Sequence, residues 1–125
     1  IGIAAAPDFT DWGFTEEEKI KLLRDGRLER DNPYGPEPTV TTRAFWQSGE
    51  TLRLLSGGVG VGCPVRLLHG QDDQDVPWHH SVRLAALLHS ADVQVTLIKD
   101  GDHRLSRDGD IALLLRTAEA LVESL

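Results

Sequence analysis

The stretch RLLHGQDDQDVPW, residues 66–78, decides the fold. It continues the run PVRLLH, residues 64–69, which is short and almost wholly apolar, as in a strand of a parallel sheet covered on both faces. After His-Gly come three aspartates and then Pro77, a residue that suits the first turn of a helix. A helix is therefore predicted over residues 77–91, with four apolar side chains facing inward: Val82, Leu84, Ala85 and Leu88.

A second strand and a second helix follow. The run VQVTLIK, residues 93–99, alternates apolar and polar side chains. The last segment has the 3.6-residue period of an amphipathic helix, with the predicted inward positions Ile111, Leu114, Leu115, Ala118, Leu121, Val122 and Leu125. The order strand, helix, strand, helix implies a right-handed crossover and a parallel sheet, so the fold class is α/β.

In a parallel sheet, the loops that follow the carboxyl ends of the strands emerge at one edge, where ligands bind. The loop after the first strand carries Asp72, Asp73 and Asp75, and the loop after the second carries His103. An acid and a histidine are thus expected to meet. An imidazole that accepts and returns a proton needs a carboxylate to hold its tautomer and to stabilise its positive charge. Asp72 and Asp75 are expected to favour the start of the following helix, and His69 to be a packed residue.

Composition excludes several classes of function. The chain has 125 residues and a net charge of −7, which argues against a nucleic-acid partner. No apolar run is long enough for a membrane span. The single cysteine, Cys63, can form no internal disulfide, so a reducing compartment is expected, and Cys63 itself is expected to be a small buried residue.

The first half of the chain has a different texture. Residues 1–6 resemble the end of a buried core strand, and residues 7–62 a lid or cap followed by a linker. Within it we predict a helix that begins with a capping box at Thr15, then a hairpin, a short helix and the flexible join SGGVGVG, residues 56–62. Because the chain starts in mid-strand, we expect a missing N-terminal part and an open sheet edge that could self-associate.

The two loops carry a resemblance to a known family. LLHGQDDQDVPW resembles the hGxxDxxVP segment of the α/β-hydrolase superfamily, and DGDH resembles its histidine loop. The pairing is similar, more narrowly, to depalmitoylating and acyl-glucuronide-cleaving members and their bacterial relatives. The resemblance implies the C-terminal part of an α/β-hydrolase fold over residues 63–125, with Asp73 as the acid and His103 as the base of a catalytic triad. No G-x-S-x-G elbow is present, so the nucleophilic serine would lie outside these residues.

The resemblance implies a serine hydrolase acting on a small-molecule carboxylic ester or thioester, without a cofactor, in the cytoplasm or, in a eukaryote, the mitochondrial matrix. The 125 residues alone are expected to be inactive. Alternatives stay open: an aspartate or cysteine nucleophile (epoxide hydrolase, dehalogenase or dienelactone hydrolase), a non-catalytic scaffold, Asp75 as the acid, and a divalent metal among the aspartates. Phe45 and Trp46 could line an acyl pocket or pack the lid.

Overall fold

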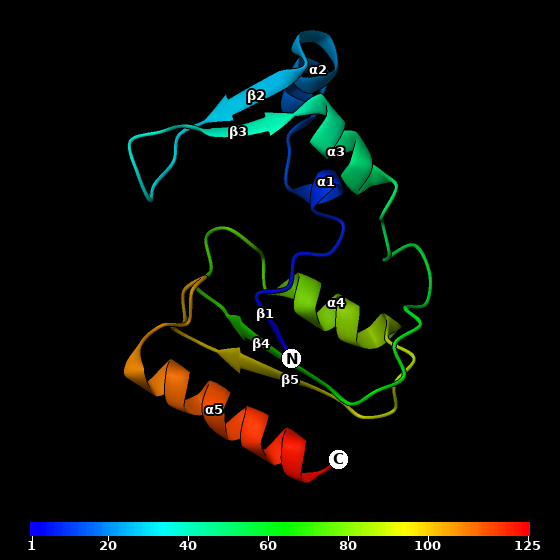
Figure 1. Ribbon diagram of the computed structural model, residues 1–125, viewed down its shortest axis with the longest axis vertical. Coiled ribbons are helices and arrows are strands. Elements are labelled where there is room, and N and C mark those ends of the chain that lie inside the picture. Colours follow the sequence, from blue (N-terminus) through cyan, green and yellow to red (C-terminus); the bar gives the residue numbers. More distant parts are fainter. The chain divides into compact units, whose positions relative to one another are not determined.

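The computed structural model describes all 125 residues and divides them into two units, each of which is described by itself (Figure 1). The sheet unit comprises Ile1–Pro7 and Leu54–Leu125, and the hairpin unit comprises Asp8–Arg53. The predicted lid and linker covered residues 7–62. Residues 54–62 group with the sheet unit in the structure, and a lid function for the remainder stays a prediction.

The sheet unit contains a three-stranded sheet in the order β1 (Gly2–Ile3), β4 (Val65–Gly70), β5 (Val93–Ile98). Both pairings are parallel, and β4 and β5 are in register from Val65 opposite Val93 to Gly70 opposite Ile98. The predicted strand–helix–strand order is therefore confirmed. The predicted first strand is correct in kind, but only two of its six residues are in β1.

Two helices cover opposite faces of this sheet, α4 (His79–Leu87) and α5 (Asp108–Glu123) (Figure 1). Neighbouring residues of β4 point to opposite faces, as in any strand. Leu68 lies with Leu113 and Leu114 of α5 around a small apolar cavity, whereas the next residue, His69, contacts Ser81 of α4. Burial increases toward the carboxyl end of β4, so the core lies directly beneath the loop that carries Asp73.

The predicted inward faces of both helices are partly wrong. Val82 is 44% exposed, and its neighbour Ser81 is fully buried instead, because the Ser81 hydroxyl hydrogen-bonds to the buried His69. On α5, three of the predicted inward positions are exposed, Ile111, Leu115 and Val122, and Leu125, which is also exposed, lies beyond the end of the helix. The segment predicted to be a flexible join is ordered around the buried Val59, which pairs with Leu88.

The hairpin unit contains α1 (Phe9–Trp12), α2 (Glu16–Asp25), β2 (Arg27–Arg30), β3 (Thr39–Thr42) and α3 (Arg43–Glu50). The predicted capping box is present: Thr15 Oγ1 accepts from the backbone N–H of Glu18, whose carboxylate accepts from the N–H of Thr15. Gly26 ends the helix with φ 80°, and the predicted hairpin is the antiparallel pair of β2 and β3.

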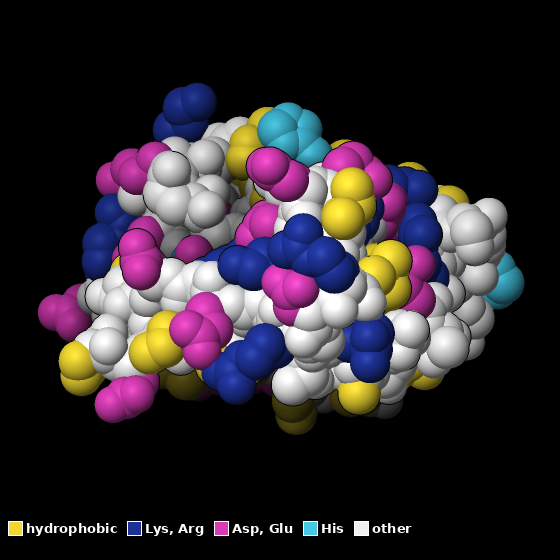
Figure 2. Space-filling model, turned by 90° about the horizontal axis from the view of Figure 1, so that it is seen from above, with side chains coloured by type: hydrophobic (Ala, Val, Ile, Leu, Met, Phe, Trp, Pro, Cys, Tyr) yellow, Lys and Arg dark blue, Asp and Glu magenta, His cyan; other side chains and the backbone are white.

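On the face of the molecule seen in Figure 2, basic side chains lie among acidic ones. Ion pairs in the hairpin unit include Arg24 with Asp25 and Arg30 with Glu18. No helix of the chain combines the length and the hydropathy that crossing a membrane requires.

Candidate active site

Asp73 lies in the loop between β4 and α4, and its side chain is fully buried. Its Oδ1 accepts hydrogen bonds from the backbone N–H groups of Asp75, at 2.8 Å, and Val76, at 2.9 Å. A role for Asp72 and Asp75 at the start of the helix stays a prediction. The helix has no side-chain cap, and Asp73 itself orders the turn that leads into it.

His103 lies in the loop after β5, and its Nδ1 is 2.9 Å from Asp73 Oδ2. An ionised carboxylate can only accept hydrogen bonds, so Nδ1 carries the proton and donates it to Asp73. The other ring nitrogen, Nε2, is then unprotonated, and the side chain is 37% exposed. The two side chains that the sequence analysis paired thus meet, in the arrangement that leaves Nε2 able to accept a proton.

The backbones of the two loops approach each other closely, and this holds the pair together. The N–H of Asp72 donates to the carbonyl of Gly101 at 3.0 Å. A Cβ added at Gly70 would lie 2.1 Å from the same carbonyl oxygen, so only glycine fits there. Asp102 Oδ1 accepts from the N–H of Leu105, at 2.9 Å, which fixes the turn just after His103.

The environment of Asp73 keeps it ionised. Burial raises the pKa of the Asp73 carboxyl, but the Val76 N–H, the His103 ring and the Asp75 N–H together outweigh burial and hold that pKa below its usual value. Asp73 is therefore a carboxylate at neutral pH, as a partner for an imidazolium must be.

Two buried residues adjoin this pair. His69 Nε2 lies 3.2 Å from Asp73 Oδ2, and His69 Nδ1 lies 2.6 Å from Ser81 Oγ. Sequence reasoning expected a packed His69 but missed Ser81, because a serine on a helix is normally assigned to the solvent side. Serine, histidine and aspartate are the members of a hydrolase triad, yet Ser81 is fully buried and cannot meet a substrate.

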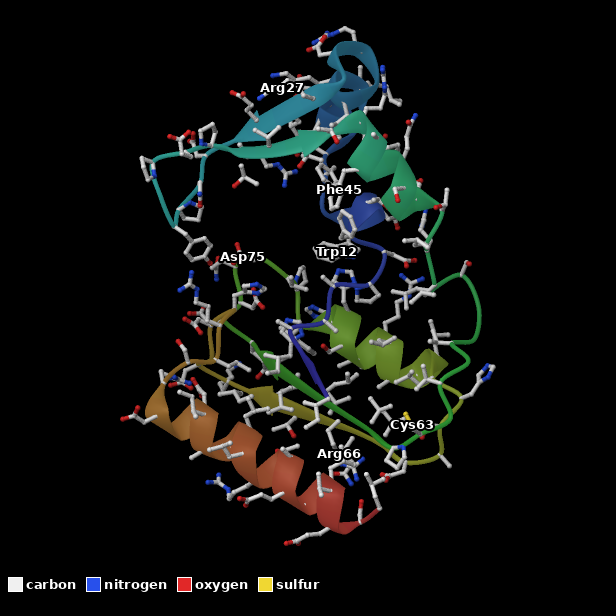
Figure 3. The ribbon with its side chains drawn as sticks, viewed as in Figure 1. Trp12, Arg27, Phe45, Cys63, Arg66 and Asp75 are labelled. Atoms are coloured by element: carbon white, nitrogen blue, oxygen red, sulfur yellow. The ribbon has the colours of Figure 1, made fainter.

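Two other features named in the sequence analysis are Cys63 and a possible metal site among the acids. Cys63 is exposed, contrary to prediction, since it precedes β4 at the opposite end of the strand from the loop that carries Asp75 (Figure 3). Possible ligand atoms of Asp73, Asp75 and His103 lie within 4.8 Å of one another. A divalent metal among these three residues therefore stays an alternative.

The aromatic residues proposed for an acyl pocket belong to the hairpin unit. Phe45 is exposed and its ring lies 5.6 Å from that of Phe9, between centroids. Trp46 Nε1 donates to the carbonyl of Thr10, which joins α3 to α1. Trp46 therefore has a packing role in this unit, and a substrate contact for Phe45 stays a prediction.

Comparison with known proteins identifies similar chains. Over its whole length the chain is 49% identical, across 129 aligned residues, to the palmitoyl-protein thioesterase ABHD10, mitochondrial, of Bos taurus, of which it covers 42%. Among solved structures, the mouse α/β hydrolase domain-containing protein 10 superposes with a TM-score of 0.87 at 34% identity, over 98% of this chain and 51% of that one. A protein from Agrobacterium vitis S4 named as a hydrolase gives 0.86 at 40%, over 95% and 47%.

No family model matches the sequence. The chain spans about half the length of the relatives that it matches. Sequence identity along the whole chain, the parallel sheet with a helix on each face and the superposition on solved hydrolases agree with one another. The chain belongs to the α/β-hydrolase superfamily and has the C-terminal part of that fold.

Proposed function

We propose that the full-length protein is a serine hydrolase of carboxylic esters or thioesters, in which Asp73 and His103 are the acid and the base of a Ser-Asp-His triad. The observation that carries this proposal is the 2.9 Å contact between His103 Nδ1 and a buried Asp73 carboxylate, in a histidine whose side chain is 37% exposed. The nucleophile is supplied from outside these 125 residues, because the one serine bonded to a histidine here is buried.

The residues of this chain would act by moving one proton. His103 Nε2 takes the proton of the serine hydroxyl as the serine oxygen attacks the acyl carbon, and Asp73 stabilises the imidazolium that forms. The imidazolium returns this proton to the departing alcohol or thiol, which leaves an acyl-enzyme. Water then attacks the acyl-enzyme, with His103 again accepting and returning a proton, and releases the carboxylic acid.

A fatty-acyl thioester of a protein is the substrate that we favour, because the matched mammalian relatives are named palmitoyl-protein thioesterases. Their names also carry the word mitochondrial, so in a eukaryotic source we propose the mitochondrial matrix as the location. A small acyl ester would enter the same chemistry, since the proton transfers at His103 are the same for an oxygen and a sulfur leaving group.

The test uses the full-length protein with a p-nitrophenyl acyl ester and an S-palmitoylated peptide. We expect hydrolysis of both, labelling by a fluorophosphonate probe, and loss of hydrolysis in His103→Ala. His89→Ala is the matched control, because His89 is an exposed histidine just beyond α4, and it should keep the parent activity.

Other outcomes point to the alternatives. Activity without fluorophosphonate labelling, on epoxide, haloalkane or enol-lactone substrates, would indicate an aspartate or cysteine nucleophile. If a folded protein is not labelled and turns over none of these substrates, that result contradicts the enzymatic proposal and favours a non-catalytic scaffold.

A further inference from the structure

The proposed chemistry leaves one buried titratable group unused, the imidazole of His69. It lies at the carboxyl end of β4 with no exposed surface, and Ser81 of α4 is equally buried. His69 Nδ1 is 2.6 Å from Ser81 Oγ, and Nε2 is 2.8 Å from the carbonyl oxygen of Val76. Both ring nitrogens therefore have partners, which come from the helix and from the loop that follow the strand.

The partners of His69 fix the position of its proton. Nε2 faces only acceptors, the carbonyl of Val76 and, at 3.2 Å, Oδ2 of Asp73. Nε2 must therefore carry a hydrogen, which it donates to Val76. Ser81 can donate its hydroxyl proton to Nδ1, and this holds the ring in the neutral Nε2–H form. Nε2 of His69 also lies 3.2 Å from the carboxylate oxygen that binds His103.

Val76 connects His69 to Asp73 a second time. Its carbonyl accepts from His69, while its N–H donates to Asp73 Oδ1. One peptide group on each side of Val76 is thereby anchored, and movement of the His69 ring would disturb both oxygens of Asp73.

We propose that His69, held by Ser81, is a positioning residue for the Asp73–His103 pair. His69 fixes the carboxylate of Asp73 and partly compensates its negative charge. The inference rests on the proposed function for its effect on turnover. Its effect on the ionisation of His103 does not depend on that function, because it follows from the contacts alone.

The consequence can be measured as a pH shift. Without the His69 N–H, the charge on Asp73 is less compensated and holds the proton of His103 more strongly. The acid limb of the pH profile should therefore move to higher pH. The other charged groups around His103 are unchanged by this substitution; they are Asp72 and Asp75 on the loop after β4, Asp100, Asp102 and Arg104 on its own loop, and Arg107 at the start of α5.

The experiment compares three variants in the full-length protein. His69→Phe keeps the ring volume without a donor, His69→Gln restores an N–H, and His89→Phe is the exposed control. The readouts are the titration midpoint of the His103 ring by NMR and the pH profile of kcat/KM on a p-nitrophenyl acyl ester. We expect His69→Phe to raise both midpoints and to lower kcat more than tenfold with little change in KM. His69→Gln should recover most of each effect, and His89→Phe should match the parent.

A folded His69→Phe protein with an unmoved His103 midpoint would overturn the inference, even if its activity is lower at every pH. If His69→Phe does not fold, the variants Ser81→Ala and His69→Gln test the proposal in its place. Ser81→Ala should fold and lower kcat several-fold, and parent-like kcat and midpoint in both variants would overturn the proposal, as would failure of both to fold. Absence of turnover in the parent would count against the proposed function and leave the NMR result to judge His69.

Discussion

Replacing Asp73 with asparagine would separate the charge of the acid from its shape. The amide has one acceptor oxygen and one donor nitrogen where the carboxylate has two acceptor oxygens. If the amide oxygen takes the place of Oδ1, it still accepts from the N–H groups of Asp75 and Val76. In the opposite orientation the amide NH₂ would meet those two donors, so we expect the first orientation.

In that orientation the amide NH₂ faces Nδ1 of His103, which also carries a hydrogen. The ring can relieve this conflict by moving its proton from Nδ1 to Nε2, and it then accepts a hydrogen bond from the amide. Nε2 becomes a donor and can no longer take the proton of the nucleophile. The fold should survive while the base is lost, with a fall of about 10⁴-fold in kcat/KM, or about 5.4 kcal/mol of transition-state stabilisation.

The assay is hydrolysis of a p-nitrophenyl acyl ester by the full-length protein, with circular dichroism to check the fold. Asp72→Asn is the control, since it removes the same charge from the same loop but from an exposed side chain that contacts only Gln74. We expect parent-like activity in this control. A loss of less than tenfold in Asp73→Asn, or equal losses in the two variants, would refute the assignment of Asp73 as the acid.

Three further predictions concern stability, measured by urea denaturation of the full-length protein. Gly70→Ala would place a methyl group 2.1 Å from the carbonyl oxygen of Gly101, so we expect a loss of about 1–3 kcal/mol and lower activity, and an unchanged free energy of unfolding would contradict this close approach. Arg107→Gln removes the guanidinium that lowers the pKa of Asp110. Because a group with a lowered pKa stabilises the fold above its unfolded-state pKa of about 4, the variant should be less stable than the parent at neutral pH, and the difference should shrink as the pH falls below about 4. The same sign applies to Asp73, whose pKa is also lowered, so the parent should lose stability more steeply than Asp73→Asn as the pH falls below the unfolded-state value of about 4, and parallel curves would exclude the carboxylate as a source of this dependence.

The meeting of Asp73 and His103 could be predicted because it follows from topology. Parallel strands place their following loops at one edge, and two apolar runs separated by a helix are readily recognised in the sequence. The capping box at Thr15 was predictable for a similar reason, since it depends on residues three apart. Local patterns and the order of elements therefore determined the fold and the central pair.

What could not be predicted depends on the partners that a side chain finds. Ser81 looks like a surface residue of an amphipathic helix, and only the buried ring of His69 beneath it gives its hydroxyl an acceptor. Leu115 and Val122 fit the apolar period of α5, but no layer of these 125 residues covers them. Periodicity assigns a face to each residue and carries no information on how much surface the opposite layer offers.

The structure gives a physical reason for the spacing of the DxxVP motif. Asp73 divides its two oxygens between two tasks, since Oδ1 binds the backbone of its own loop and Oδ2 binds His103. Val76, three places after the acid, donates its N–H to Oδ1. Its side chain is buried in the core and its carbonyl accepts from His69, so both anchor the loop. Pro77 has no N–H to compete for the carboxylate, and it leads directly into α4. The aspartates at positions 72 and 75 carry the same charge, but they do not accept the backbone hydrogen bonds that hold Asp73 toward His103. The chemistry and the local fold therefore require the same residue.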